Sequence, residues 1–310
     1  MSRRGGPVAY AALVAVCFFW GTTYLAIRIS IEHLRPAIVI SGRFLIAGAI
    51  LLAIARARGV HRPSGYGLRT ACASGIVVLG IGTAGTFYAE LFIPSSFASL
   101  LVTISPFIMV AFEAALGGEA LQRRTIVGMA VGFSGAGLLL LPGSGTEAFA
   151  RSTLIGFSIM MVGITAWCLG SIYQRRQPSE ADSVFIAGIQ NVAAGLLYIP
   201  IALFIPGPVV WTARGLLALL YLAIFGSVVA YTAFVIAMDR LPVAIASIYP
   251  YINAVVAVAL GWLFFREPFG AREVMAMLLI FTGVVIVKAT GSRGGVKPVQ
   301  TQAARAAVTD

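Results

Sequence analysis

The chain has 310 residues, of which 59% are hydrophobic and 11% charged, and its formal net charge is +11. Soluble domains carry roughly 25% charged residues, so this composition excludes an ordinary soluble protein, which would expose large apolar patches and aggregate. The basic residues are scattered as singles and pairs and form no basic stripe, so nucleic acid is not an expected partner.

Ten apolar runs of 18 to 23 residues follow one another along the chain. A helix of this length crosses about 30 Å of hydrocarbon at about 1.5 Å per residue. We therefore predict an all-α integral membrane protein with ten transmembrane helices. The predicted helices lie at residues 8–28, 36–55, 70–90, 95–115, 124–141, 154–174, 184–205, 214–236, 243–264 and 271–288.

Positive charge is distributed unevenly between the two ends of these helices. With the N-terminus in the cytoplasm, 15 of the 22 Lys and Arg residues fall inside, 6 fall outside, and Arg43 falls within a helix. Cytoplasmic loops of membrane proteins carry such an excess of positive charge. The pattern predicts a multi-pass protein of the cytoplasmic (inner) membrane with both termini inside. The polar, Gly-rich segment 290–310 is predicted to be a disordered cytoplasmic tail.

The sequence matches itself when it is shifted by 147–148 residues. Each half holds five predicted helices, and because five is odd, the second half must have the opposite orientation in the membrane. Inverted repeats are typical of secondary transporters, which open a central site to each side in turn. We predict a first repeat over 1–147 and a second over 148–289. The matching pairs include Trp20 and Trp167, Gly48 and Gly195, Pro94 and Pro242, Glu119 and Glu267, and Gly135 and Gly283.

Several short motifs occur in a fixed order within this duplicated frame. They are FWGTTYLAIR at 19–28, GRFLIAG at 42–48, AELFIPSSFASLL at 89–101, Gly118-Glu119 and Arg266-Glu267. Together they resemble the EamA-type exporters of the drug/metabolite transporter superfamily over about residues 8–288. The resemblance implies a ten-helix inverted-repeat fold with a central cavity. It also implies export of amino acids, related metabolites or drugs, driven by proton exchange or by the gradient of the solute.

The positions of the prolines within the predicted helices differ from this family in the ninth helix. Pro106 and Pro250 remove backbone donors, so both are predicted to kink or break their helices and to free carbonyl groups that a cavity can use. Family members often have proline in the ninth helix where Asn253-Ala254 stands here, opposite Ser105-Pro106. The two halves therefore need not bend alike.

Arg43 lies about eight residues into the second predicted helix. A charged side chain in hydrocarbon costs at least about 2.5–3.5 kcal/mol on insertion scales and marks a functional position by default. Its guanidinium offers two parallel donors to the carboxylate of a solute. The alternative is a structural arginine that pairs with a carboxylate or with helix-end carbonyls, or that extends to the interface.

Glu90 lies near the outer end of the third predicted helix, directly after Tyr88-Ala89. The second and third helices are antiparallel, so Glu90 can lie near Arg43 and pair with it. Glu90 can also bind a cationic amine or exchange a coupling proton. The alternative is a boundary carboxylate that is already in water.

Other polar and aromatic side chains recur within the predicted helices. Some are spaced i, i+4 and so share one helix face. Such groups line a cavity for a small amphipathic solute or hold helices together and anchor the interface. The candidate solute-binding residues, with Arg43 and Glu90, are Trp20, Tyr24, Tyr88, Ser99, Thr103, Trp167, Gln190, Asn191, Tyr231, Ser247, Tyr251 and Asn253.

These observations favour a secondary transporter that exports a small solute by alternating access. A carrier of a lipid-phosphate or sugar-nucleotide cargo is an alternative, although such cargo favours several cationic groups. An integral-membrane enzyme is a further alternative, which would need clustered carboxylates or histidines. No catalytic residue, metal site, cofactor or obligate protein partner is expected. The expected partners are the solute, the lipid bilayer and, as a candidate coupling ion, the proton.

Overall fold

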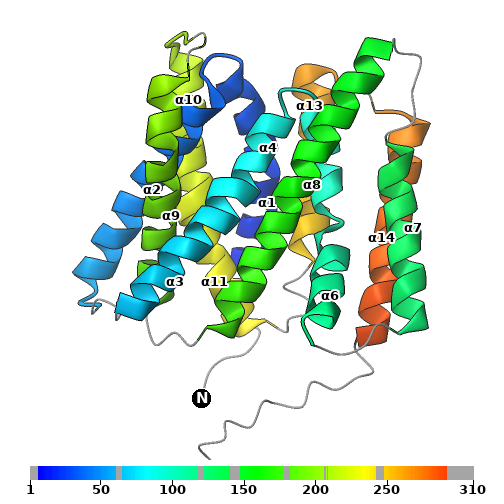
Figure 1. Cartoon of the computed structure of the whole chain (residues 1–310), viewed down its shortest axis with the longest axis horizontal. Helices are drawn as coiled ribbons and strands as arrows, with labels where there is room; N and C mark the ends of the chain where they lie inside the picture. The colour runs from blue at the N-terminus through cyan, green and yellow to red at the C-terminus, as the bar shows by residue number, and fades with distance from the viewer. Residues whose placement is uncertain are drawn as a thin grey trace, which may run out of the picture.

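The computed structural model of the protein describes residues 6–60, 65–117, 122–139, 147–177, 182–205, 207, 209–241, 248–267 and 269–291. Within these ranges the regular structure is helical and no strand occurs. The helices run roughly parallel or antiparallel to one another in an elongated bundle (Figure 1). The candidate residue Ser247 and residues 292–310 of the predicted tail lie outside the described ranges.

The helices fall into ten successive rods along the described part of the chain, in agreement with the predicted number. The first five are α1 (Pro7–Ile31), α2 (Pro36–Ala57), a rod of α3 (Gly65–Gly75), η1 (Ile76–Thr83) and α4 (Ala84–Ala89), a broken rod of α5 (Ser95–Val102) and α6 (Ser105–Ala115), and α7 (Arg123–Leu138). The next five are α8 (Glu147–Arg176), α9 (Ser183–Phe204), a rod of α10 (Ala213–Tyr221), η2 (Leu222–Val229) and α11 (Ala230–Arg240), then α13 (Tyr249–Phe265) and α14 (Ala271–Gly291).

Seven of the described rods are long and apolar enough to cross a membrane. The helix α13, with 17 residues, is a shorter apolar helix. Large apolar side chains also cover the outside of the bundle, such as Val14, Leu203 and Trp262, which are 66%, 72% and 59% exposed. An apolar exterior is stable in lipid and unstable in water, so the fold agrees with the predicted class of membrane protein.

The helix boundaries follow from local sequence. Pro7 and Pro36 occupy the first turns of α1 and α2, where a missing backbone donor costs nothing. Asp182 caps α9 by accepting hydrogen bonds from the backbone of Val184 and Phe185. Pro106 lies in the first turn of α6, directly after the interruption that separates α5 from α6, as predicted. Pro250 lies in the first turn of α13 rather than within a longer described helix.

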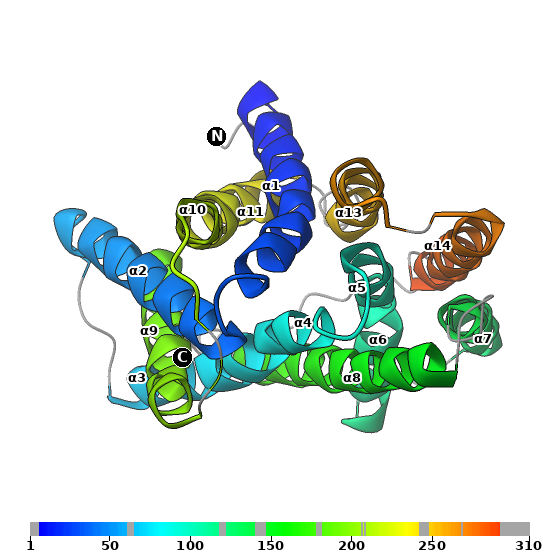
Figure 2. The ribbon, with the colours of Figure 1, turned by 90° about the horizontal axis from the view of Figure 1, so that it is seen from above.

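Two helix pairs make close contacts through small residues. The helix α2 packs along α9, and α7 packs along α14; Figure 2 shows the second pair at one edge of the bundle. A Cβ atom added at Gly48 of α2 would lie 2.9 Å from the backbone nitrogen of Val192, and one added at Gly195 of α9 would lie 3.0 Å from that of Leu45. Such glycines allow helix backbones to approach closely in membranes.

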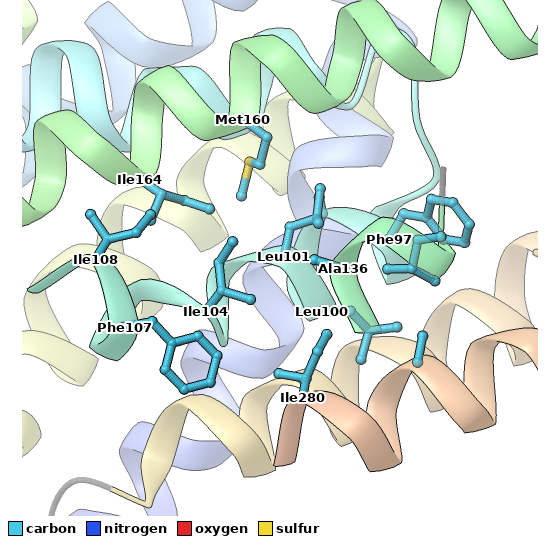
Figure 3. Packing of buried hydrophobic residues seen from close by; sticks show 14 of the residues in the cluster. Phe97, Leu100, Leu101, Ile104, Phe107, Ile108, Ala136, Met160, Ile164 and Ile280 are labelled. Carbon is cyan, nitrogen blue, oxygen red and sulfur yellow. The ribbon is translucent and has the colours of Figure 1, made fainter. Parts of the chain in front are cut away.

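The largest buried apolar cluster surrounds the broken rod of α5 and α6. Phe97, Leu100, Ile104 and Phe107 from this rod are 0–3% exposed. Figure 3 shows them between α8, which contributes Met160, and α14, which contributes Ile280. The helix break therefore lies within a packed core, so the neighbouring helices hold both halves of the rod in place.

The contact between α2 and α9 generates a stability prediction. Gly48→Ala should lower the free energy of unfolding by about 1–3 kcal/mol, because the added methyl group meets the backbone of α9. Thermal denaturation of the detergent-solubilised protein measures the change. Gly137→Ala in α7 is the matched control, since a Cβ atom there meets nothing within 4 Å and alanine favours helix by about 1 kcal/mol. Equal melting temperatures for the two variants would contradict the packing argument.

Candidate functional site

Arg43 is buried, with 6% of its surface exposed, and it joins three helical segments. Its Nε donates a 2.9 Å hydrogen bond to the hydroxyl of Ser227 in η2. Its guanidinium also lies over the rings of Phe44 in α2 and Phe87 in α4, at 5.3 and 5.8 Å from the ring centroids. Among the described residues it forms no ion pair with Glu90, so the considered Arg43–Glu90 pair is not present in this conformation.

A row of further polar contacts joins α1 to the same part of the second half. The indole nitrogen of Trp20 donates a 2.9 Å hydrogen bond to the carbonyl of Gly226 in η2. The hydroxyls of Thr22 and Tyr221 share a hydrogen bond of 2.5 Å. The wider turns of a π-helix change the pairing of its backbone groups and occur often at functional sites. We call the contacts of Trp20, Thr22 and Arg43 with α10 and η2 the polar seam.

The ring of Trp20 extends the polar seam into an aromatic group. Its centroid lies 5.3 Å from the ring of Phe234 in α11 and 5.1 Å from that of Tyr249 in α13. These separations are typical of favourable aromatic pairs. Three segments of the second half therefore meet one indole of the first half.

Glu90 is fully buried and caps the end of α4, so it is not the boundary carboxylate in water that the sequence left open. Both of its carboxylate oxygens lack a hydrogen-bond partner among the described residues. The guanidinium of Arg28 donates a 2.6 Å hydrogen bond to its main-chain carbonyl and does not pair with the carboxylate. Tyr24, one turn before Arg28, packs against the buried apolar cluster around α5 and α6. A buried carboxylate without a partner is costly, which makes Glu90 a candidate position for a cationic ligand or a proton.

Gln190 and Asn191 of α9 lie in a separate polar group. The amide nitrogen of Gln190 donates to the hydroxyl of Ser74 at 3.0 Å and to the amide oxygen of Gln174 at 2.9 Å. Asn191 donates to the carbonyl of Ala187 at 2.9 Å in its own helix. These bonds join α9 to α3 and α8, so they fit the alternative role of holding helices together.

The remaining predicted residues lie around these two groups or within the core. Ser99 and Thr103 donate to carbonyls of their own rod at 2.7 and 2.6 Å. The amide of Asn253, in the orientation that satisfies its neighbours, donates to the carbonyls of Cys17 and Tyr249 at 2.8 and 2.9 Å. The other aromatic residues pack as follows: Tyr88 against Tyr198, Tyr251 against Phe281, Trp167 against Gly82, and Tyr231 against the cluster of Leu51 and Val184.

Sequence reasoning missed three polar residues that the structure places at helix contacts. Thr22, Tyr221 and Ser227 complete the polar seam, and hydroxyls within apolar helices were their available signal. Their partners lie about 200 residues away in the chain, so no local pattern identifies them. Across the described residues there is also no group of three His, Cys, Asp or Glu side chains that could hold a metal ion.

An all-helical bundle with an apolar exterior and membrane-length helices is the fold of a multi-pass membrane protein. A model of the EamA-like transporter family matches residues 7–141 and 154–289. The chain therefore belongs to this family, within the drug/metabolite transporter superfamily, and the predicted resemblance is confirmed.

Named relatives agree with this assignment. The "Uncharacterized inner membrane transporter YedA" of Escherichia coli strain K12 is 32% identical over 282 residues, which are 90% of each chain. "Protein PecM" of Dickeya dadantii is 24% identical, over 89% of this chain and 91% of its own. A solved crystal structure with 24% identity has a TM-score of 0.66 over 92% of this chain and 98% of its own, which shows a shared fold. The protein is thus a multi-pass inner-membrane transporter.

The hydrogen bond between Arg43 and Ser227 generates a second prediction. Ser227→Ala should lower the free energy of unfolding by about 1–3 kcal/mol, because the buried guanidinium loses an acceptor that lipid cannot replace. The melting temperature in detergent measures this change. Ser134→Ala is the control, because the Ser134 hydroxyl is exposed and bonds its own helix at 2.7 Å. A loss of stability in the control as large as that in Ser227→Ala would contradict the assigned role.

Proposed function

We propose that this transporter exports small metabolites, amino acids or drugs across the cytoplasmic membrane by alternating access. The observation that carries the proposal is the polar seam, because it places a buried arginine and an indole at the contact between the first and second halves of the chain. A solute that binds there contacts both halves, so its binding and release can follow their relative movement. Both termini lie in the cytoplasm in this proposal, as the distribution of positive charge favours.

The proposal includes two inverted repeats, over 1–147 and 148–289, and three features support it. The π-helical segments begin at Ile76 and Leu222, which are 146 residues apart. The glycines Gly48 and Gly195 each approach the backbone of the other's helix in the same way. The helix α1 also packs against α10, η2 and α11, while α8 packs against α3, η1 and α4. Each half therefore offers its first helix to the third rod of the other half.

Arg43 is proposed to bind an acidic group of the solute. Within the described part of the chain only its Nε makes a hydrogen bond, to Ser227, and the four N–H bonds of its terminal nitrogens have no such partner. A guanidinium with free N–H groups can donate two parallel hydrogen bonds to the carboxylate of a solute. Glu90 is proposed to bind a cationic amine or a coupling proton, and Trp20 and Tyr24 to form walls of the solute site.

The buried charges favour a small solute over a polyanionic one. Among the described residues, the buried charged side chains are Arg43, Glu90, Glu267 and Glu273. Glu267 accepts hydrogen bonds from Ser95 and Ser96, and Glu273 pairs with Arg272, so Arg43 and Glu90 are the buried charges left for a solute. A lipid phosphate or a sugar nucleotide would favour several cationic groups, and among the described residues Arg43 is the one buried cation. A zwitterion or a small amine with an acidic group fits this set of charges better.

The proposed export is tested by comparing the metabolites excreted by cells that overproduce the protein or its Arg43→Ala variant at matched levels. We expect one or a few small solutes to accumulate outside only with the unchanged protein, with at least about a tenfold loss in Arg43→Ala, because one charge-assisted pair contributes about 1.5–3 kcal/mol. Arg58→Ala, at the exposed end of the same helix, is the control and should export normally.

Two outcomes would count against this proposal in different ways. Equal export by all three proteins would support export but contradict the proposed role of Arg43 in the solute site. An unchanged medium across amino acids, related metabolites and added drugs would contradict export itself.

A further inference from the structure

Glu267 lies in the turn between α13 and α14, yet its carboxylate binds the first turn of α5 in the other half of the chain. Its Oε1 accepts hydrogen bonds from the backbone nitrogen and the hydroxyl of Ser95, each at 2.8 Å. Its Oε2 accepts a 2.9 Å hydrogen bond from the backbone nitrogen of Ser96. The side chain is 8% exposed, so water competes little for these bonds.

The start of α5 needs such a partner. Its N-cap residue is Pro94, which provides no side-chain cap, and the first backbone N–H groups of a helix have no acceptor within the helix. A carboxylate at this position also meets the positive end of the helix dipole. The second half of the chain therefore supplies the cap that the first half lacks.

The backbone around Glu267 is arranged to bring it back over α13. Arg266 adopts a left-handed conformation with φ of 49°, which is unfavourable for a residue other than glycine and persists only where the surroundings hold it. The next backbone nitrogen, of Glu267, donates to the carbonyl of Gly261 at 3.2 Å. A Cβ atom at Gly261 would lie 2.4 Å from Oε2 of Glu267. The carboxylate therefore fits here only because residue 261 is a glycine.

The helix that Glu267 caps carries candidate solute residues. Ser99 lies one turn beyond Ser95 and is 1% exposed, and Thr103 ends the helix. Glu90 is the C-cap residue of α4 and precedes the turn that leads into α5. If the two halves separate at this end of the bundle, the three hydrogen bonds of Glu267 must break.

We propose that Glu267 is a positioning residue for transport, a latch that holds α5 against the second half and keeps this end of the bundle closed. This inference rests on the proposed alternating access, in which the turn before α5 faces the outside. In the conformation described here the latch is closed. Loss of its charge should shift the protein toward the state that is open to the outside.

The test uses single-cysteine reporters in a protein whose native cysteines are replaced, and it needs no solute. Ser99→Cys reports on the latched end, with a membrane-impermeant maleimide applied to intact cells. Ala12→Cys, buried near the start of α1 among residues of α11, reports on the opposite end in inside-out vesicles. In Glu267→Gln we expect Ser99→Cys to react about tenfold faster, while Ala12→Cys reacts no faster than before.

Asp182→Asn is the matched control, because Asp182 also caps a helix N-terminus but, among the described residues, its side chain bonds within its own half, to Val184 and Phe185. It should leave both labelling rates unchanged. Gly261→Ala keeps the glutamate and fills the space of its Oε2, so it should also raise Ser99→Cys labelling. If the Glu267→Gln protein does not accumulate in the membrane, the labelling of Gly261→Ala tests the latch by the same criteria.

The latch is overturned if Ser99→Cys labelling does not rise, or if both reporters react faster together, which would indicate general loosening of the fold. These outcomes differ from a failure of the proposed export. A protein without solute export can still show faster labelling of Ser99→Cys alone, and an exporter without a latch exports the solute with no change in labelling.

Discussion

The structure depends on one constraint, which is that lipid offers no hydrogen-bond partner, so polar groups within the bundle must find partners in the protein. The chain meets this constraint in two ways, and among the described residues the Glu90 carboxylate is an exception. Hydroxyls such as Ser99 and Thr103 return to carbonyls of their own rod, which needs no second helix. Trp20, Arg43 and Glu267 instead bind groups of the other half, so the bonds that satisfy them also hold the halves together.

These bonds are part of a wider set between the halves, in which Gln190 donates to Ser74, Tyr198 to the carbonyl of Gly80, and Arg35 to the carbonyl of Ala202. Glycines and apolar side chains make the close contacts of α2 with α9 and of α7 with α14. The first pair is also joined by Ser41, which donates to the carbonyl of Gly195 at 3.1 Å, and by Arg35, which donates to the carbonyl of Ala202 at 3.0 Å. The bonds of Arg43 and Glu267 lie elsewhere, at the polar seam and at the start of α5. A movement that breaks and reforms only those bonds would leave the two packed pairs intact.

Much of this fold was predictable from local sequence. The apolar runs set the helices because their length matches the hydrocarbon thickness, and Pro106 marked the break after α5. The partners were not predictable, because Arg43 and Ser227 are 184 residues apart and Ser95 and Glu267 are 172 apart. Periodicity assigns a residue to a helix face but does not identify the neighbour of that face. Glu267 was recognisable as a repeated residue and as part of the Arg266-Glu267 motif, but its role depends on the left-handed turn at Arg266.

If the two halves are inverted copies, equivalent positions of the halves face opposite sides of the membrane, and labelling of such positions tests the inverted repeat most directly. Leu116 and Phe264 are 148 residues apart, are 49% and 63% exposed, and lie at the ends of α6 and α13, which Figure 1 draws at opposite ends of the bundle. Single cysteines at these positions should react with a membrane-impermeant maleimide from opposite sides, Leu116→Cys in inside-out vesicles and Phe264→Cys in intact cells. Reaction of both from the same side would contradict the inverted repeat and the alternating access built on it.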